Sequence, residues 1–144
     1  MSPEEFLGTL GRMQATVEGS QEEPLRACLE PLWDGIHNNF VRAEGPDGTP
    51  WPARKDDLPH PLLVLTGALI KGATGSGGNV LTVGHDGRDI TTGVDGSQVD
   101  YAIFHMTGTR YMPPRPFMYA NRETVDACAD VFGNAAFELF VGVI

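Results

Sequence analysis

Three prolines within four residues constrain how this chain can fold. Pro113, Pro114 and Pro116 lie in a run from His105 to Tyr119 that is also rich in aromatic residues, methionines and arginines. Proline fixes φ at about −65° and lacks a backbone N–H, so none of the three can lie inside a helix or a central strand. Residues before prolines favour extended backbone, so we expect Met112 to Arg115 to run straight. This stiff segment can either brace the core or present side chains to another protein.

The aromatic residues beside the prolines keep both interpretations open. Phe117 and Met118 could fill the core of their own chain or face a partner. Trp51 lies between Pro50 and Pro52, and it could cover the core as a lid or contact a partner, because tryptophan is enriched at binding hot spots. The high average burial of tryptophan favours the lid.

The length and charge of the chain limit what it can be. Its 144 residues suit a single domain over 1–144, at whose periphery a helix within residues 1–20 could lie. The formal net charge of −9 argues against a nucleic-acid-binding surface, which needs clustered lysines and arginines. An acidic surface mainly favours solubility, and it would also repel DNA.

Cysteines and hydropathy bear on the compartment. Cys28 and Cys128 are the only cysteines, and without a CxxC spacing they indicate small core residues in a reducing compartment, not a metal site or a disulfide framework. No apolar run reaches about 18 residues, and the acidic N-terminus does not resemble a signal peptide. We therefore expect a soluble protein made in the cytoplasm, without membrane contact.

Helices are expected at both ends. Ser2 and Glu5 form a capping box with a proline between them, and Ser20 with Glu23 forms a second one. Pro31 should kink or divide the second helix. Apolar residues at helical spacing predict the buried stripes, and these are Leu25, Cys28, Leu32, Ile36 and Phe40 in the second helix, and Val125, Ala129 (or Cys128), Phe132, Ala136 and Phe140 in a closing helix over 122–139.

The middle of the chain is expected to supply a small sheet. Residues 61–71 could form a buried strand or a helix that opens at Thr66. The glycine loop, residues 74–79, is expected to be the tip of a hairpin that returns through 80–83, and 90–94 is a further strand. The fold class predicted is α+β, with helices at both ends packed on a small, mainly antiparallel β-sheet with long hairpin loops.

No catalytic, cofactor-binding or metal-binding residue is predicted, and the chain is not expected to be an enzyme. The glycine loop lacks the lysine of a phosphate-binding loop, and the histidines lack metal-ligand spacing. A small hydrolase or nucleotide-binding enzyme that uses the glycine loop with His85 and Asp86 is the alternative from another class. A regulatory binding module, as in toxin–antitoxin systems, is a third, which the lack of a basic patch disfavours.

Four segments together resemble a known family. They are Phe40–Trp51 with its Pro-Asp-Gly-x-Pro-Trp loop, Leu63–Leu69 with Thr-Gly-Ala-Leu, His105–Gly108, and Met112–Phe117 with Met-Pro-x-Arg-Pro-Phe. In this order they resemble the phage virion morphogenesis and tail-completion family, which is related to the neck proteins of long-tailed bacteriophages. The resemblance spans most of the chain from about Leu25 onward, and Met-Pro-x-Arg-Pro-Phe is its most specific part.

The resemblance implies a structural virion protein that acts in tail completion or head–tail joining. It implies a ring, hexameric by analogy, in the neck around the DNA channel, between the head–tail connector and the tail-tube proteins. DNA would pass through without sequence-specific binding. A tail terminator or stopper ring of the same neck is the alternative. The protein would be made in the host bacterial cytoplasm and end in the virion.

The proline-rich run and the glycine loop are the expected contact surfaces, one because it is stiff and the other because it is flexible. The candidate interface residues are Trp51, Gly75, Ser76, Gly77, Gly78, Arg110, Tyr111, Met112, Arg115, Phe117 and Tyr119.

Overall fold

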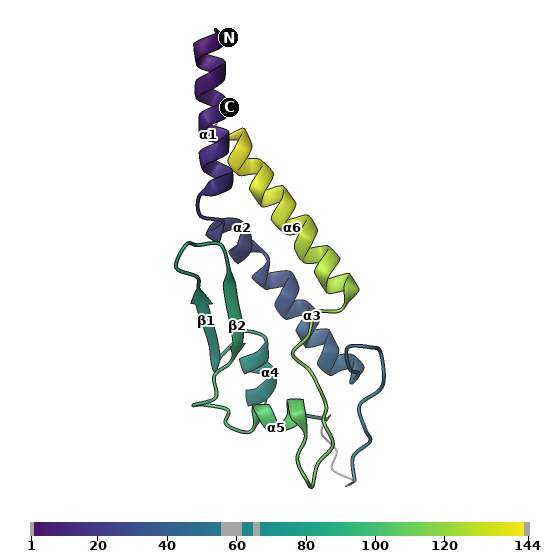
Figure 1. Ribbon diagram of the computed structural model, residues 1–144. Helices are drawn as coiled ribbons and strands as arrows, with labels where there is room; N and C mark the ends of the chain where they lie inside the picture. The colour runs from purple at the N-terminus through teal and green to yellow at the C-terminus, as the bar shows by residue number, and fades with distance from the viewer. Residues whose placement is uncertain (1, 56–61, 65–66, 143–144) are drawn as a thin grey trace.

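The computed structural model describes residues 2–55, 62–64 and 67–142. It is an α+β structure, drawn out between a helical arm at one end and loops at the other (Figure 1). The elements are α1 (Pro3–Glu18), α2 (Glu22–Ala27), α3 (Leu29–Arg42), α4 (Ala68–Ala73), β1 (Asn79–Val83), β2 (Ile90–Val94), α5 (Ala102–Thr107) and α6 (Arg122–Val141). No helix in these ranges is both long enough and apolar enough to cross a membrane.

Helix α1 begins as its sequence predicts but is poorly covered. The Ser2 side chain accepts the N–H of Glu5, and the Glu5 side chain accepts the N–H of Ser2, which completes the capping box. Within α1 only Thr9 is buried, and the apolar side chains of Phe6 and Leu7 are exposed. The helix lies beside the end of α6 and projects beyond the rest of the molecule (Figure 1). It is therefore the most peripheral element of the fold.

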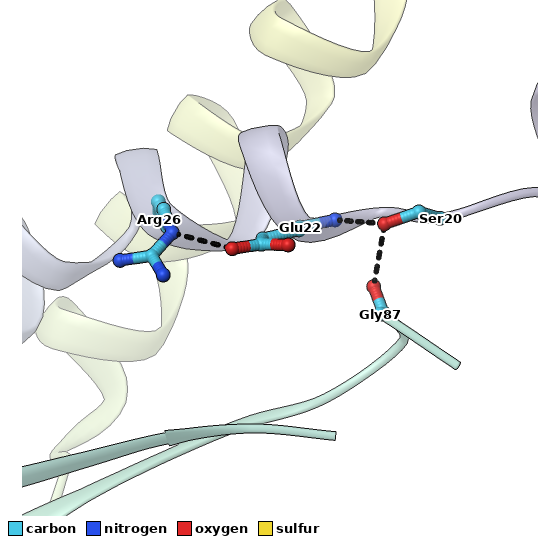
Figure 2. Close-up of polar contacts among 4 residues, drawn as sticks. All are labelled: Ser20, Glu22, Arg26 and Gly87. Atoms are coloured by element: carbon cyan, nitrogen blue, oxygen red, sulfur yellow. Dashed lines mark hydrogen bonds and ion pairs between the residues drawn. The ribbon is translucent and has the colours of Figure 1, made fainter. Parts of the chain in front are cut away.

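The second capping box is wrong, because α2 begins one residue later than that motif requires. Gln21 is the N-cap, so Ser20 lies outside the helix and Glu23 makes no return bond to it. The Ser20 hydroxyl instead accepts the N–H of Glu22 and donates to the Gly87 carbonyl at 3.5 Å, as Figure 2 shows. Ser20 thus ties the start of α2 to the turn of the β-hairpin.

Pro31 divides the second helical region, as expected. Its ring would clash with the carbonyl of the residue four positions earlier, which is Ala27, and α2 ends at that residue. Helix α3 then starts at Leu29 and turns Ile36 and Phe40 into the core.

The glycine loop is not a hairpin tip, which corrects that prediction. Residues 68–73 form a helix, so the loop joins α4 to β1. Gly75 has a φ of 78°, and the N–H of Ser76 bonds the Lys71 carbonyl, which is the usual glycine-dependent end of a helix. The actual hairpin pairs β1 with β2 antiparallel, from Asn79 opposite Val94 to Val83 opposite Ile90.

The core lies between the helices and the loops more than on the sheet. Its buried apolar residues are Ile36, Phe40, Trp51, Leu69, Ala73, Val99, Ala102 and Phe117. None of them belongs to a strand. The two-stranded sheet lies against α4 and α2, and its Val94 packs on the core while remaining partly exposed. Helix α6 packs on α2 and α3, where Cys128 and not Ala129 faces inward, and Val125 is exposed.

Two glycines at different places in the helices give the first prediction. A methyl group at Gly35 in α3 would collide with the buried Thr124 side chain of α6, whereas one at Gly133 would meet nothing within 4 Å. We expect Gly35→Ala to lower the free energy of unfolding by about 1–3 kcal/mol. Gly133→Ala, the matched control, should raise it by up to about 1 kcal/mol. Urea denaturation of both variants measures this, and equal effects would contradict the close contact of α3 with α6.

Candidate interaction surface

The proline-rich strap, residues 113–120, contains neither helix nor strand. It runs from the loop end of the molecule alongside α3 to the start of α6 (Figure 1). Phe117 in its middle is 0% exposed and packs on Phe40, with ring centroids 5.2 Å apart. The strap is therefore part of the core, and the prediction that Phe117 belongs to an interface is wrong.

The carbonyls of the strap are bonded by side chains of other segments. The buried amide of Asn39 donates to the carbonyls of both Phe117 and Tyr119, each at 2.9 Å. The indole of Trp51 donates to the Pro116 carbonyl at 2.9 Å. A segment that cannot join a helix or a sheet thus still has its buried polar groups satisfied.

Trp51 is a lid on the core, as its sequence context favours, and its place among the interface residues is wrong. It is 6% exposed and meets Phe40 edge to face. Tyr119 is half-buried, and its hydroxyl donates to the Glu44 carbonyl at 2.6 Å. Burial, followed by the nearby Glu44, raises the pKa of this phenol, which keeps it protonated as a donor.

Arg115 also faces inward, so it too is removed from the expected interface. It is 9% exposed, and its guanidinium donates to the carbonyls of Pro52 at 2.9 Å and Ala53 at 3.1 Å. Its backbone N–H donates to the His105 carbonyl at 2.7 Å. Arg115 therefore joins the strap to the loop that follows α3 and to α5.

His105 lies next to this arginine. Its Nδ1 is buried and, among the described residues, has no hydrogen-bond partner, while its ring meets Tyr101 edge to face. Burial, and secondarily the charge of Arg115, lowers the pKa of this imidazole below its ordinary value of 6.5. The folded chain therefore takes up a proton at His105 at a lower pH than the unfolded chain does.

One part of the proline-rich run does face solvent. Thr109 and Met112 pair through two backbone hydrogen bonds, which leaves Arg110 and Tyr111 at the tip of a two-residue turn. Tyr111 is 82% exposed, and the Arg110 guanidinium lies 5.7 Å from the centre of its ring. The turn 107–114 and Lys55 line an open groove of about 580 Å³. We call Arg110 and Tyr111 the tip.

The remaining candidates lie in two places, next to the tip and in the glycine loop. Met112 is half-buried beside the tip, and Gly75, Ser76 and Gly77 are exposed, with Gly78 half-buried. Gly75 is held against Trp33, because a Cβ there would collide with the indole ring. The glycine loop is therefore a built helix end and offers less freedom than its composition predicts.

The residues of the enzyme alternative are not arranged as a catalytic group. Asp86 accepts the N–H of Arg88 and so shapes its own turn, and both His85 and Asp86 are exposed. Within residues 2–55, 62–64 and 67–142, no group of three or more histidine, cysteine or acidic side chains could hold a metal ion. The tip and its groove present an aromatic ring, Tyr111, and two cations, Arg110 and Lys55.

Asn39 is the residue of this region that the sequence did not single out. Its only signal is a polar side chain beside Ile36 and Phe40 on the stripe of α3, where the strap happens to pass.

No family model matches the sequence, and comparisons with curated proteins and with solved structures find no match.

The bonds of Arg115 give the second prediction. Arg115→Lys replaces a planar group that reaches two carbonyls by a single ammonium, so we expect a loss of about 1–3 kcal/mol in the free energy of unfolding. Arg110→Lys at the exposed tip is the control and should change it by less than about 0.5 kcal/mol. Urea denaturation separates the two. Equal stabilities would show that Arg115 does not hold the strap.

The third prediction concerns pH. The unfolded chain takes up a proton at His105 near pH 6.5, and the folded chain only at lower pH, so the free energy of unfolding should fall as the pH drops below about 6.5. His105→Leu should flatten this dependence between pH 7 and pH 5, and the exposed His37→Gln should keep it. Thermal melts across this range test it, and identical slopes in wild type and His105→Leu would contradict it.

Proposed function

We propose that this chain is a structural subunit of the neck of a long-tailed bacteriophage, where it acts in tail completion or head–tail joining. The observation that carries the proposal is the tip. Tyr111 is 82% exposed on a two-residue turn whose base continues into the anchored strap. Tyrosine and arginine are the residue types that most often dominate protein interfaces, and a contact residue held in place loses little entropy on binding.

The sequence motifs support the same role. Met-Pro-x-Arg-Pro-Phe, the most specific of the segments that resemble the tail-completion family, comprises Met112 at the base of the turn and the strap as far as Phe117. In this proposal Arg115 and Phe117 of the motif hold the strap, and the tip before it makes the contact. In this proposal the motif holds the tip in position, and the motif itself does not touch the partner.

The proposed assembly is a ring of copies of this chain around the DNA channel, six by analogy with the family that it resembles. Its neighbours would be the head–tail connector and the tail-tube proteins. The net charge of −9 would repel the DNA that passes. The position in the neck, as completion, terminator or stopper ring, follows from which half of the virion the protein binds.

The fourth prediction tests this function. The purified protein should form a ring, alone or on isolated heads or tails of the virus that encodes it, as judged by mass in solution and by electron microscopy. Tyr111→Ser should weaken binding to that target at least about tenfold, because it removes an exposed aromatic anchor. Phe137→Ser removes another exposed aromatic residue, 66% exposed on α6, and should bind as wild type.

Two outcomes would contradict the proposal. A wild-type protein that stays monomeric and binds neither heads nor tails would exclude the neck role. If Tyr111→Ser bound normally, the neck role would remain possible, but the tip would be excluded as the surface that contacts the partner.

A further inference from the structure

The two cysteines of the chain lie against each other, although 100 residues separate them. The Cys28 thiol donates to the Cys128 carbonyl with a sulfur–oxygen distance of 3.4 Å, and the Cys128 thiol donates to the Cys28 carbonyl at 3.7 Å. Each sulfur thus points at the other residue's backbone. Both residues are half-buried, and both thiols are free.

The local structure allows these side chains to meet. Cys28 occupies the break between α2 and α3, which Pro31 imposes, so its backbone is not confined within a helix. Cys128 lies on the face of α6 that packs on α2. Burial raises the pKa of both thiols, which keeps them protonated as hydrogen-bond donors in the reduced protein.

The contact between α6 and the junction of α2 and α3, which the two cysteines bridge, buries few side chains. Of the residues of α6 only Thr124 is buried, and α1 rests on α6. The ion pair between Arg42 and Glu123, at 3.5 Å, is exposed and contributes little. The attachment of the helical arm to the rest of the molecule therefore depends on half-buried contacts, and a covalent bond here would change it substantially.

We propose that Cys28 and Cys128 are a latent disulfide pair, which an oxidising surrounding closes to fix α6 to the junction of α2 and α3. The inference goes beyond the proposed function and does not depend on it. In a reducing cytoplasm the thiols stay free, and outside the cell disulfides persist.

Oxidised glutathione, a small disulfide, is a sufficient oxidant. One cysteine loses its proton to water and its thiolate attacks a glutathione sulfur, which gives a mixed disulfide and releases one glutathione thiolate. The second cysteine, also as a thiolate, attacks the protein sulfur of the mixed disulfide and releases the other glutathione. The two glutathione thiolates take up the two protons. The protein loses two protons and two electrons, and the oxidant gains them.

The fifth prediction follows. Full-length wild-type protein, incubated with oxidised glutathione until its thiol content is constant, should lose the mass of two hydrogens without a glutathione adduct, and proteolysis should yield a Cys28–Cys128 cross-linked peptide. Its Tm should rise by about 5–15 °C, because the bond closes a loop of about 100 residues. Dithiothreitol should reverse both changes.

Single variants provide the control. Cys28→Ala and Cys128→Ala each keep one thiol, so oxidised glutathione should leave one adduct on each and should not raise the Tm. If a variant does not fold, the mass change and the cross-linked peptide of the wild-type protein still decide the test. Three results would each overturn the proposal: stable glutathione adducts on the native wild type, disulfides between molecules, or thiols that stay free although the same reagent modifies them in denaturant.

Discussion

The structure depends on how the proline-rich strap satisfies its backbone. A segment with prolines at 113, 114 and 116 cannot pair in a sheet or coil into a helix, yet it passes through the core. The amide of Asn39 and the indole of Trp51 bond its carbonyls, and Phe117 fills the space between α3 and the following loop. Because unpaired polar groups are costly when buried, these few side chains decide whether the fold closes.

Because of this constraint, two parts of the proline-rich run from His105 to Tyr119 have different roles. The strap is held inside by Phe117 and Arg115, and the tip that precedes it is held outside by the pairing of Thr109 with Met112. The stiffness that makes the strap a good brace also fixes the position of Tyr111. The proposed neck contact thus uses a small exposed part of the run from His105 to Tyr119, while Arg115 and Phe117 of the same run are buried.

The opposite end of the molecule, with the helical arm, has fewer buried contacts. Helix α1 and the end of α6 bury few side chains, and the hairpin turn is tied to the start of α2 by Ser20 and by the N–H of Gln21, which donates to the Gly87 carbonyl at 2.8 Å. The buried apolar residues gather around Phe117, and α1 and α6 have one buried residue each. Cys28 and Cys128 lie where α6 meets the junction of α2 and α3, between these two regions.

Local signals in the sequence determined the helices at both ends, the capping box of α1, the break before Pro31 and the extended strap, because caps, helical spacing and proline act through near neighbours. The sequence also suggested Trp51 as a lid. Tertiary structure decided what distant segments do for each other. It made the glycine loop a helix end against Trp33, turned Arg115 and Phe117 inward, gave Asn39 its two carbonyls and brought Cys28 to Cys128. These outcomes rest on contacts between residues about 40 to 100 positions apart, and composition and spacing carry no record of such distances.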